Sequence, residues 1–124
     1  MNKALEKQIA GTHYKTMTVQ PIEFIAHLGL NFFQGNIVKY ISRAKDSTDI
    51  DKAIHYCELA IELGDKEVLP MQGEMASMYM DTILKYVENN NLQPLTDLII
   101  YFAFFKKYNN CKILIEKYKK NKTK

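Results

Sequence analysis

The apolar residues of this chain recur with a helical period along nearly its whole length. Between residues 33 and 44 they occupy positions 33, 37, 40, 41 and 44, a stripe down one side of an α-helix. No Asn-Gly or Asp-Gly pair stands between alternating apolar runs, so no β-hairpin is indicated. The pattern predicts an all-α fold, a compact bundle of about five to six helices. A second stripe consists of Ile50, Ile54, Cys57 and Ile61.

Proline, glycine and capping residues predict where the first helices begin and end. Pro21 suits the first turn of a short helix through residue 28. Gly29 suits its end, because glycine adopts left-handed backbone angles at little cost. Ser47 or Thr48 is expected to cap a later helix that ends at Gly64.

The second half of the chain predicts three more helices. Residues 71–89 form a Met-rich helical pattern. Residues 95–108 are apolar nearly all round, so this helix is either central to the fold or covered by another subunit. Asn109 and Asn110 are expected to separate it from a Lys-rich final helix. The expected packing residues of the Met-rich helix are Met75, Met78, Ile83 and Tyr86.

With 124 residues, 47% apolar and 25% charged, the chain has the size and composition of one globular domain. Its formal net charge of +3 is unevenly distributed, since residues 106–124 carry a local +7 and residues 1–105 a local −4. A mildly acidic body opposes the wrapping of a polyanion. We therefore expect a single helical domain over residues 1–124 and no nucleic-acid partner.

The sequence gives no indication of export or of a membrane span. Residues 1–10 are polar and amphipathic, and the longest apolar run, residues 98–105, covers eight residues where a span needs about 20. Cys57 and Cys111 do not indicate a disulfide framework. We expect a cytoplasmic protein without a membrane partner.

Residues 11–20 are expected to form an extended lead-in to the first helix. Within it, Gly11 permits close backbone approach, and His13 and Tyr14 offer the hydrogen bonds and stacking that suit a nucleotide base. Alternatively, His13 and Tyr14 only pin this segment to the core.

A row of polar and basic residues lies on the predicted helix over residues 33–44. Asn36, Lys39 and Arg43 follow spacings of three and four, which places their side chains on one face. Such a set suits phosphate, because arginine grips two oxygens at once and lysine adds a mobile charge. The alternative is a solvated face in which these cations pair with Asp46 or Asp49.

Gly35 lowers the stability of the predicted helix over residues 33–44 and therefore indicates close approach of a backbone or a ligand.

The acids on the following helix fit either a divalent cation or a solvated face. No His or Cys pair has zinc-site spacing, so we assign no metal ligand. One side of that helix carries Asp51, His55, Glu58 and Glu62, and another carries Lys52 and Tyr56.

Several common catalytic motifs are absent from the sequence. There is no G-x-x-x-x-G-K-[ST] loop, no G-x-G-x-x-G after a strand and no G-x-S-x-G elbow. Conventional kinase, dehydrogenase and hydrolase folds are therefore not expected, and no residue is given a catalytic role.

An ordered set of motifs between residues 11 and 62 resembles a small family of phage proteins that lack a phosphate-binding loop. That family is known as nucleotide kinases or as a domain of unknown function. The motifs are His13-Tyr14, the run Gln20-Pro21-Ile22-Glu23-Phe24-Ile25, the run Phe33-Gln34-Gly35-Asn36-Ile37-Val38-Lys39-Tyr40-Ile41-Ser42-Arg43, and Asp51-Lys52-Ala53 with Tyr56.

The resemblance implies a nucleotide-binding module over residues 11–65, acting in the cytoplasm of an infected bacterial host, with residues 66–124 serving packing or assembly. Mg²⁺ is expected only if the protein is a kinase. The acidic linker over residues 45–49 departs from the family pattern. The implied phosphate contacts are Asn36, Lys39, Arg43 and Lys15, the base or ribose contacts His13, Tyr14, Gln20 and Tyr40, and the points of backbone approach Gly11 and Gly35.

Three functions follow as alternatives. The first is a nucleotide-binding protein similar to phage nucleoside monophosphate kinases, and the second is a non-catalytic sponge that sequesters a nucleotide-derived host immune signal. The third is a helical interaction or assembly protein that uses apolar residues 95–105. We also expect a homo-oligomer, because a small helical domain has few concave sites and a pocket between subunits encloses a ligand.

Overall fold

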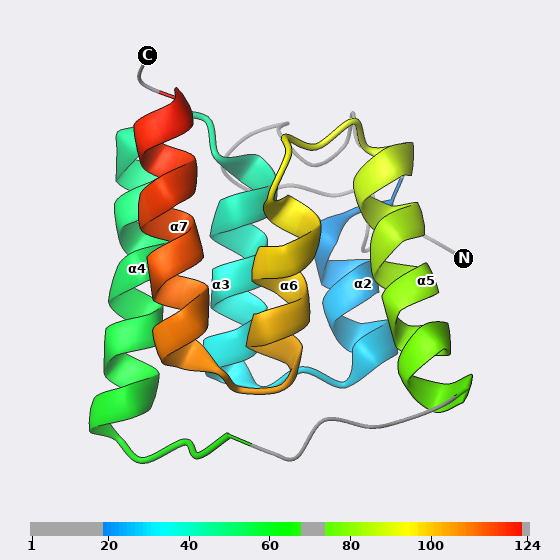
Figure 1. Cartoon of the computed structure of the whole chain (residues 1–124), viewed down its shortest axis with the longest axis horizontal. Coiled ribbons are helices and arrows are strands. Elements are labelled where there is room, and N and C mark those ends of the chain that lie inside the picture. Colours follow the sequence, from blue (N-terminus) through cyan, green and yellow to red (C-terminus); the bar gives the residue numbers. More distant parts are fainter. Residues whose placement is uncertain (1–18, 68–73, 123–124) are drawn as a thin grey trace.

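The computed structural model describes residues 19–67 and 74–122, and within these ranges it contains six α-helices and no β-strand (Figure 1). The predicted all-α bundle is confirmed. Most of the expected lead-in, residues 11–18, lies outside the described residues. The helices are α2 (Pro21–Leu28), α3 (Phe32–Arg43), α4 (Ser47–Glu62), α5 (Glu74–Asn89), α6 (Thr96–Phe104) and α7 (Tyr108–Lys122).

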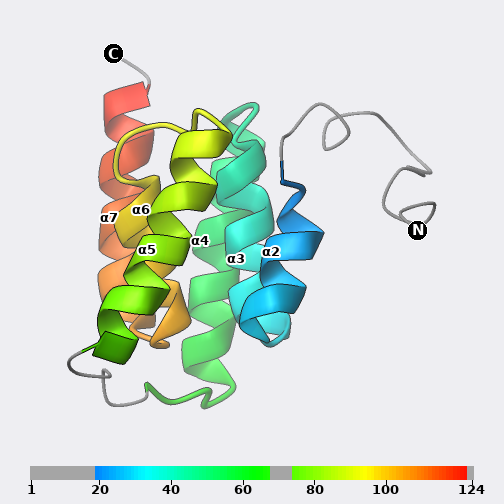
Figure 2. The same cartoon turned by 90° about the vertical axis from the view of Figure 1, so that its right-hand side faces the viewer.

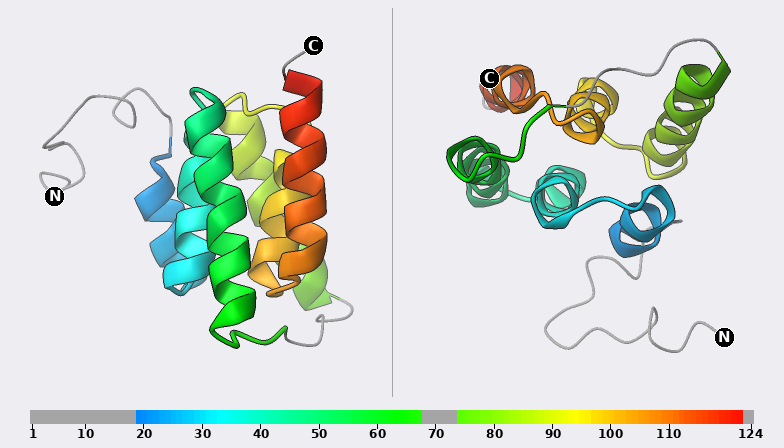
Figure 3. Two further views of the ribbon diagram at one scale, coloured as in Figure 1. Left: turned by 90° about the vertical axis from the view of Figure 1, so that its left-hand side faces the viewer. Right: turned by 90° about the horizontal axis from the view of Figure 1, so that it is seen from below.

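The helices form two layers of three. Figure 2 shows the layers edge-on and Figure 3 shows them from below, with α2, α3 and α4 in one row and α5, α6 and α7 in the other. Consecutive helices run in opposite directions (Figure 1). Across the layers α3 packs on α6 and α4 on α7. α2 meets α5 where the rings of Phe24 and Tyr86 stack with their centroids 4.0 Å apart.

The core lies between the two layers. Its largest fully buried side chains are mostly isoleucines, which come from both layers. Cys57 and Cys111 belong to this core, and both have free thiols. Burial of these side chains supplies the main stabilisation of the fold.

The position of α6 explains its apolar sequence. It lies between α5 and α7 and faces α3 (Figure 3), and Ile99, Ile100 and Ala103 are fully buried. The Gln34 amide of α3 donates to the carbonyl oxygens of Ala103 and Phe104 at 3.1 and 2.8 Å. These bonds satisfy acceptors that the last turn of a helix leaves free. α6 is thus central to the fold, and α3, α5 and α7 pack on it while Leu98 stays 40% exposed.

The boundaries predicted from proline and glycine are confirmed. α2 begins at Pro21, and Gly29 after its end has a φ of 65°. Gly64, with a φ of 79°, follows the end of α4. Both glycines occupy the left-handed region, where a side chain is strained.

The capping residue of α4 differs from the prediction. Asp46 is the N-cap, because its carboxylate accepts hydrogen bonds from the backbone N–H groups of Thr48 and Asp49 at 2.9 and 3.2 Å. Ser47 and Thr48 already belong to the helix. Asp46, Ser47 and Thr48 all have side chains that can cap a helix, so the backbone geometry decides which of them is the N-cap.

Some predicted packing residues face solvent instead. Ile83 and Tyr86 of α5 are buried as expected, but Met78 is 65% exposed. Ile61 near the end of α4 is 44% exposed, because the buried side of the helix passes through Cys57 and Ala60 instead. The side chain of Met75 lies outside the described part of the chain.

The junction between α6 and α7 also differs from the prediction. α6 ends at Phe104, and Asn109 and Asn110 lie in the first turn of α7 instead of separating two helices. The chain reverses earlier because Lys106 adopts left-handed backbone angles, with a φ of 59°. The Lys107 N–H then donates to the Phe102 carbonyl at 2.9 Å, which closes the end of α6.

Candidate functional site

The first layer carries a cluster of aromatic and basic side chains on helices α3 and α4. In α3, Ile37, Val38 and Ile41 are at most 1% exposed and face the core. Between them, Lys39 is half-buried, and the half-buried Tyr40 packs against the core. We call this cluster the α3–α4 face and define it as Phe32, Asn36, Lys39, Tyr40, Lys52 and Tyr56.

Three aromatic rings form a continuous strip on this face. The rings of Tyr40 and Tyr56 are nearly parallel, with an interplanar angle of 14° and centroids 6.0 Å apart. Phe32 contacts Tyr56 edge-on at 5.7 Å, and its side chain is 69% exposed. Exposed aromatic surface of this kind suits stacking against a planar ligand.

Two lysines meet at one of these rings. The Nζ atoms of Lys39 and Lys52 lie 5.0 and 5.2 Å from the centroid of the Tyr40 ring. The ring face attracts both cations. Within residues 19–67 and 74–122, neither ammonium group has a carboxylate within ion-pair distance. Because α3 contains no acidic residue, the face is locally basic.

The lysines near the other end of the chain have different partners. Each one that forms an ion pair does so with a carboxylate from the segment that includes α4 and the residues after it. The pairs are Lys106–Asp65 at 2.9 Å, Lys107–Glu67 at 3.2 Å, Lys112–Glu58 at 2.9 Å and Lys119–Asp51 at 2.6 Å. Much of the C-terminal charge is thus matched within the protein.

Arg43 is anchored at the junction of α3 and α4. Its Nε donates to Asp49 Oδ2 at 3.1 Å, and the Lys45 backbone N–H donates to the same oxygen at 2.8 Å. Asp49 is 1% exposed, so this pair is largely removed from solvent. Arg43 therefore has the predicted pairing with Asp49, but the pair is not solvated as expected, and Lys39 has no carboxylate partner among the described residues. A phosphate contact by Arg43 stays a prediction.

The other predicted site residues either lie away from the α3–α4 face or fall outside the residues that the structure describes. Gln20 is the N-cap of α2 and forms a capping box with Glu23. At Gly35 a side-chain Cβ would meet Ile25 Cγ2 at 3.1 Å, so the close approach there is α2 packing on α3. Gly11, His13, Tyr14 and Lys15 fall outside the described residues.

Phe32 is a component of the face that sequence reasoning missed. It precedes Asn36 by one helical turn and so extends the row that continues to Lys39. The sequence signal that could have predicted its place is the helical spacing between Phe32 and the polar residues Asn36 and Lys39. The role of Lys52 depends on how α4 packs beside α3, which spacing within one helix does not reveal.

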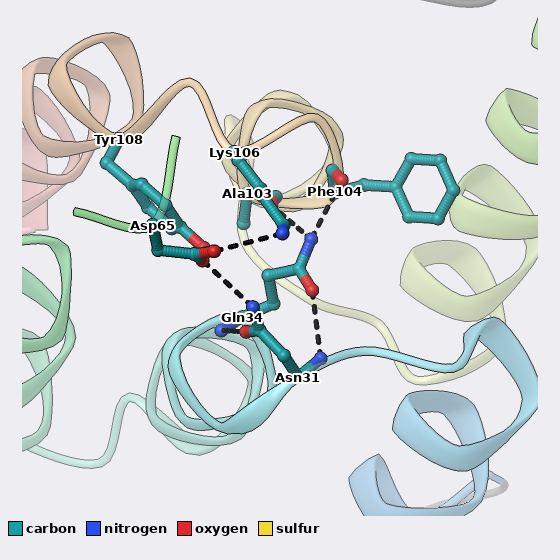
Figure 4. A network of polar contacts seen from close by, with 7 residues as sticks. All are labelled: Asn31, Gln34, Asp65, Ala103, Phe104, Lys106 and Tyr108. Carbon is teal, nitrogen blue, oxygen red and sulfur yellow. Dashed lines mark hydrogen bonds and ion pairs between the residues drawn. The ribbon is translucent and has the colours of Figure 1, made fainter. Parts of the chain in front are cut away.

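A second polar cluster lies at the opposite end of α3 from Arg43. Asp65 Oδ2 accepts hydrogen bonds from Asn31 Nδ2 at 2.8 Å and from the Tyr108 hydroxyl at 2.5 Å, while Lys106 pairs with Oδ1 (Figure 4). Burial raises the pKa of the Asp65 carboxyl, but the hydrogen bonds and the Lys106 charge outweigh it, so this pKa lies below its usual value. Burial and the Asp65 carboxylate raise the pKa of Tyr108. These groups fasten helix ends to one another.

Cavities occur away from the α3–α4 face. One of about 500 Å³ adjoins Asp65 and includes Lys106 and Lys107, whose charges are already paired. Another, of about 420 Å³, lies between α2 and α5 above the stacked Phe24 and Tyr86 rings. The two sites thus differ in charge: among the described residues Lys39 and Lys52 have no carboxylate partner, whereas Lys106 and Lys107 at the first cavity are paired.

None of the helices in the described part of the chain is long and apolar enough to cross a membrane. No group of three or more His, Cys, Asp or Glu side chains among them is arranged to hold a metal ion.

Residues 9–58 match the model of the family DUF3310, whose description is a protein of unknown function. No curated protein and no solved structure matches the chain. The expected resemblance to a nucleotide-kinase family is therefore wrong, because the family found over these residues carries no assigned activity. The matched segment includes every residue of the α3–α4 face and none of α5, α6 or α7.

Proposed function

We propose that this chain binds a nucleotide, or a small molecule derived from one, on the α3–α4 face. The observation that carries the proposal is that Lys39 and Lys52 both lie over the Tyr40 ring without a carboxylate partner among the described residues. The ligand would take the place of that partner.

The two lysines favour a doubly charged anion such as a phosphate group. Each Nζ lies about 5 Å from the same centroid, so the two ammonium groups are no more than about 10 Å apart. At this separation their repulsion is only partly screened by salt. Because lysine side chains are flexible, both ammonium groups can turn toward one phosphate, which relieves their repulsion and gains charge-assisted hydrogen bonds from both.

The aromatic strip offers a surface on which the base of a nucleotide can stack. Tyr56 and Phe32 continue from Tyr40 along the same face and offer ring surface next to the cations. Stacking of a nucleobase on an aromatic side chain stabilises binding by about 1–3 kcal/mol. Cations and rings together therefore favour a ligand that joins a phosphate to a planar base.

The interaction-protein alternative assigns assembly to the apolar helix over residues 95–105. Helices α3, α5 and α7 pack on α6, so only part of that helix, including Leu98 at 40% exposure, is open to another subunit, and we favour ligand binding. Binding without chemical change needs only the groups already found on the α3–α4 face. A homo-oligomer stays a prediction.

Isothermal titration calorimetry of the full chain with adenosine monophosphate tests the proposal. The double variant Lys39→Ala/Lys52→Ala should bind at least about tenfold more weakly, since charge-assisted hydrogen bonds each contribute about 1.5–3 kcal/mol. The matched control Lys112→Ala/Lys119→Ala removes the same charge from paired lysines and should keep the affinity within about twofold.

Two results would count against the proposal. Equal weakening in both double variants would mean that only the overall charge attracts the ligand. Absence of heat with every nucleoside monophosphate would reject nucleotide binding itself. Chromatography of the ligand after incubation should return it unchanged.

A further inference from the structure

The amide of Asn36 has a fixed orientation on the α3–α4 face. Its Nδ2 donates to the backbone carbonyl of Phe32, one turn earlier, at 2.8 Å. A carbonyl oxygen accepts hydrogen bonds only, so the nitrogen must point toward it and Oδ1 must point away. Within the described residues no donor reaches this Oδ1. The face therefore presents one oriented acceptor.

The position of this acceptor relates it to the rest of the face. Along α3, Asn36 lies between Phe32, which contacts Tyr56, and Lys39, which contacts Tyr40. Phe32 and Lys39 are separated by about 10 Å along the helix axis at the standard rise per residue. A mononucleotide placed with its phosphate at the lysines has its base beside Phe32 and Asn36.

We infer that the α3–α4 face selects nucleotides whose base carries an exocyclic amino group, which donates to Asn36 Oδ1 while the base stacks at Phe32 and Tyr56. This inference rests on the proposed function and adds the base preference to it. The ligand class is an amino-bearing nucleoside monophosphate, with its phosphate between Lys39 and Lys52.

Removing the amino group from the base takes away the donor from which Asn36 Oδ1 accepts a hydrogen bond. The Asn36 oxygen then has no partner in the ligand. A site that hydrogen-bonds a substrate group discriminates against an analogue that lacks the donor. On an exposed face the discrimination is moderate, because water replaces part of the lost bond.

Adenosine monophosphate and purine riboside monophosphate form the matched ligand pair, because the second compound differs only in lacking the amino group. Calorimetric titration of the full chain should give about three- to tenfold tighter binding of the adenosine compound. In Asn36→Ala the ratio should fall to about one, through loss of adenosine monophosphate affinity. Asn109→Ala, an exposed asparagine of α7, should keep the original ratio.

The outcomes separate this inference from the proposed function. Equal binding of the two ligands by the unsubstituted chain would overturn the base preference and leave nucleotide binding in place. A preference that persists in Asn36→Ala, with its circular dichroism unchanged, would also overturn it, because the acceptor would lie elsewhere. Failure of both ligands to bind would reject the proposed function.

Discussion

The lysines of the two layers differ in what they contact. In and just before α7, four lysines pair with carboxylates of α4 and of the segment after it. In the first layer, Lys39 and Lys52 lie over an aromatic ring instead. The paired set includes four of the eight lysines in residues 106–124, and its ion pairs connect one layer to the other. The smaller set in the first layer has charge left for a ligand, so the partners of a lysine indicate its role better than the net charge does.

The largest expected effect comes from breaking the paired set at its most buried carboxylate. Asp65→Ala removes the acceptor shared by Asn31, Lys106 and Tyr108, and should lower the free energy of unfolding by about 3 kcal/mol. Urea denaturation measures this loss. Glu67→Ala, whose carboxylate is 57% exposed, is the matched control and should cost much less.

Ligand affinity makes the same variant a test of the comparison. Nucleotide affinity of folded Asp65→Ala should stay unchanged, because Asp65 contacts none of the residues that define the α3–α4 face. A parallel fall in affinity and stability would break the distinction between the two sets of lysines.

Acid should remove the contribution of Asp65 selectively. Its pKa in the folded protein lies below the ordinary value of 3.8, so the ionised carboxylate stabilises the fold above that pH. The contribution is lost as the pH falls through the folded-state pKa. The difference in unfolding free energy between the wild-type chain and Asp65→Asn should be constant from about pH 7 to pH 5 and shrink below about pH 4.

A full difference persisting at about pH 2 would contradict this assignment. Glu67→Gln serves as the control, because it removes an exposed carboxylate from the same set of ion pairs.

The smallest effect is expected at the exposed pairs on α7. Lys119→Ala should lower the unfolding free energy by less than about 1 kcal/mol, because its pair with Asp51 is largely exposed and screened by salt. Thermal unfolding beside Lys117→Ala, an exposed neighbour, measures the difference. A much larger loss would show that even exposed lysines of this set hold the layers together.

The sequence predicted those parts of the fold that depend on local chemistry. Pro21 and Gly29 bound α2 correctly, because proline fixes φ and glycine tolerates left-handed angles whatever surrounds them. The end of α6 was missed because Lys106, a residue without that tolerance, takes a φ of 59° while its side chain pairs with Asp65. That pair forms only when distant segments meet.

In the candidate site, as in the fold, the sequence predicted what depends on local spacing and missed what depends on contacts between helices. The row from Asn36 to Lys39 follows from helical spacing alone. The assignment of Arg43 to Asp49 depends on the turn between α3 and α4, where Ala44 has a φ of 35°. The meeting of Lys39 and Lys52 at Tyr40 depends on the register of two helices, which a periodic pattern leaves undetermined.

The hydrogen bonds of Gln34 bear on how this protein folds. Its Oε1 accepts from the Asn31 N–H in a local cap, and its Nε2 donates to Ala103 and Phe104, about 70 positions along the chain (Figure 4). One side chain thus joins a contact that forms early to one with a large loop-closure entropy. The carbonyl groups that end α6 gain these donors only after α3 has docked. We therefore expect the segment matched by the family model to unfold in one cooperative transition with the helices beyond it.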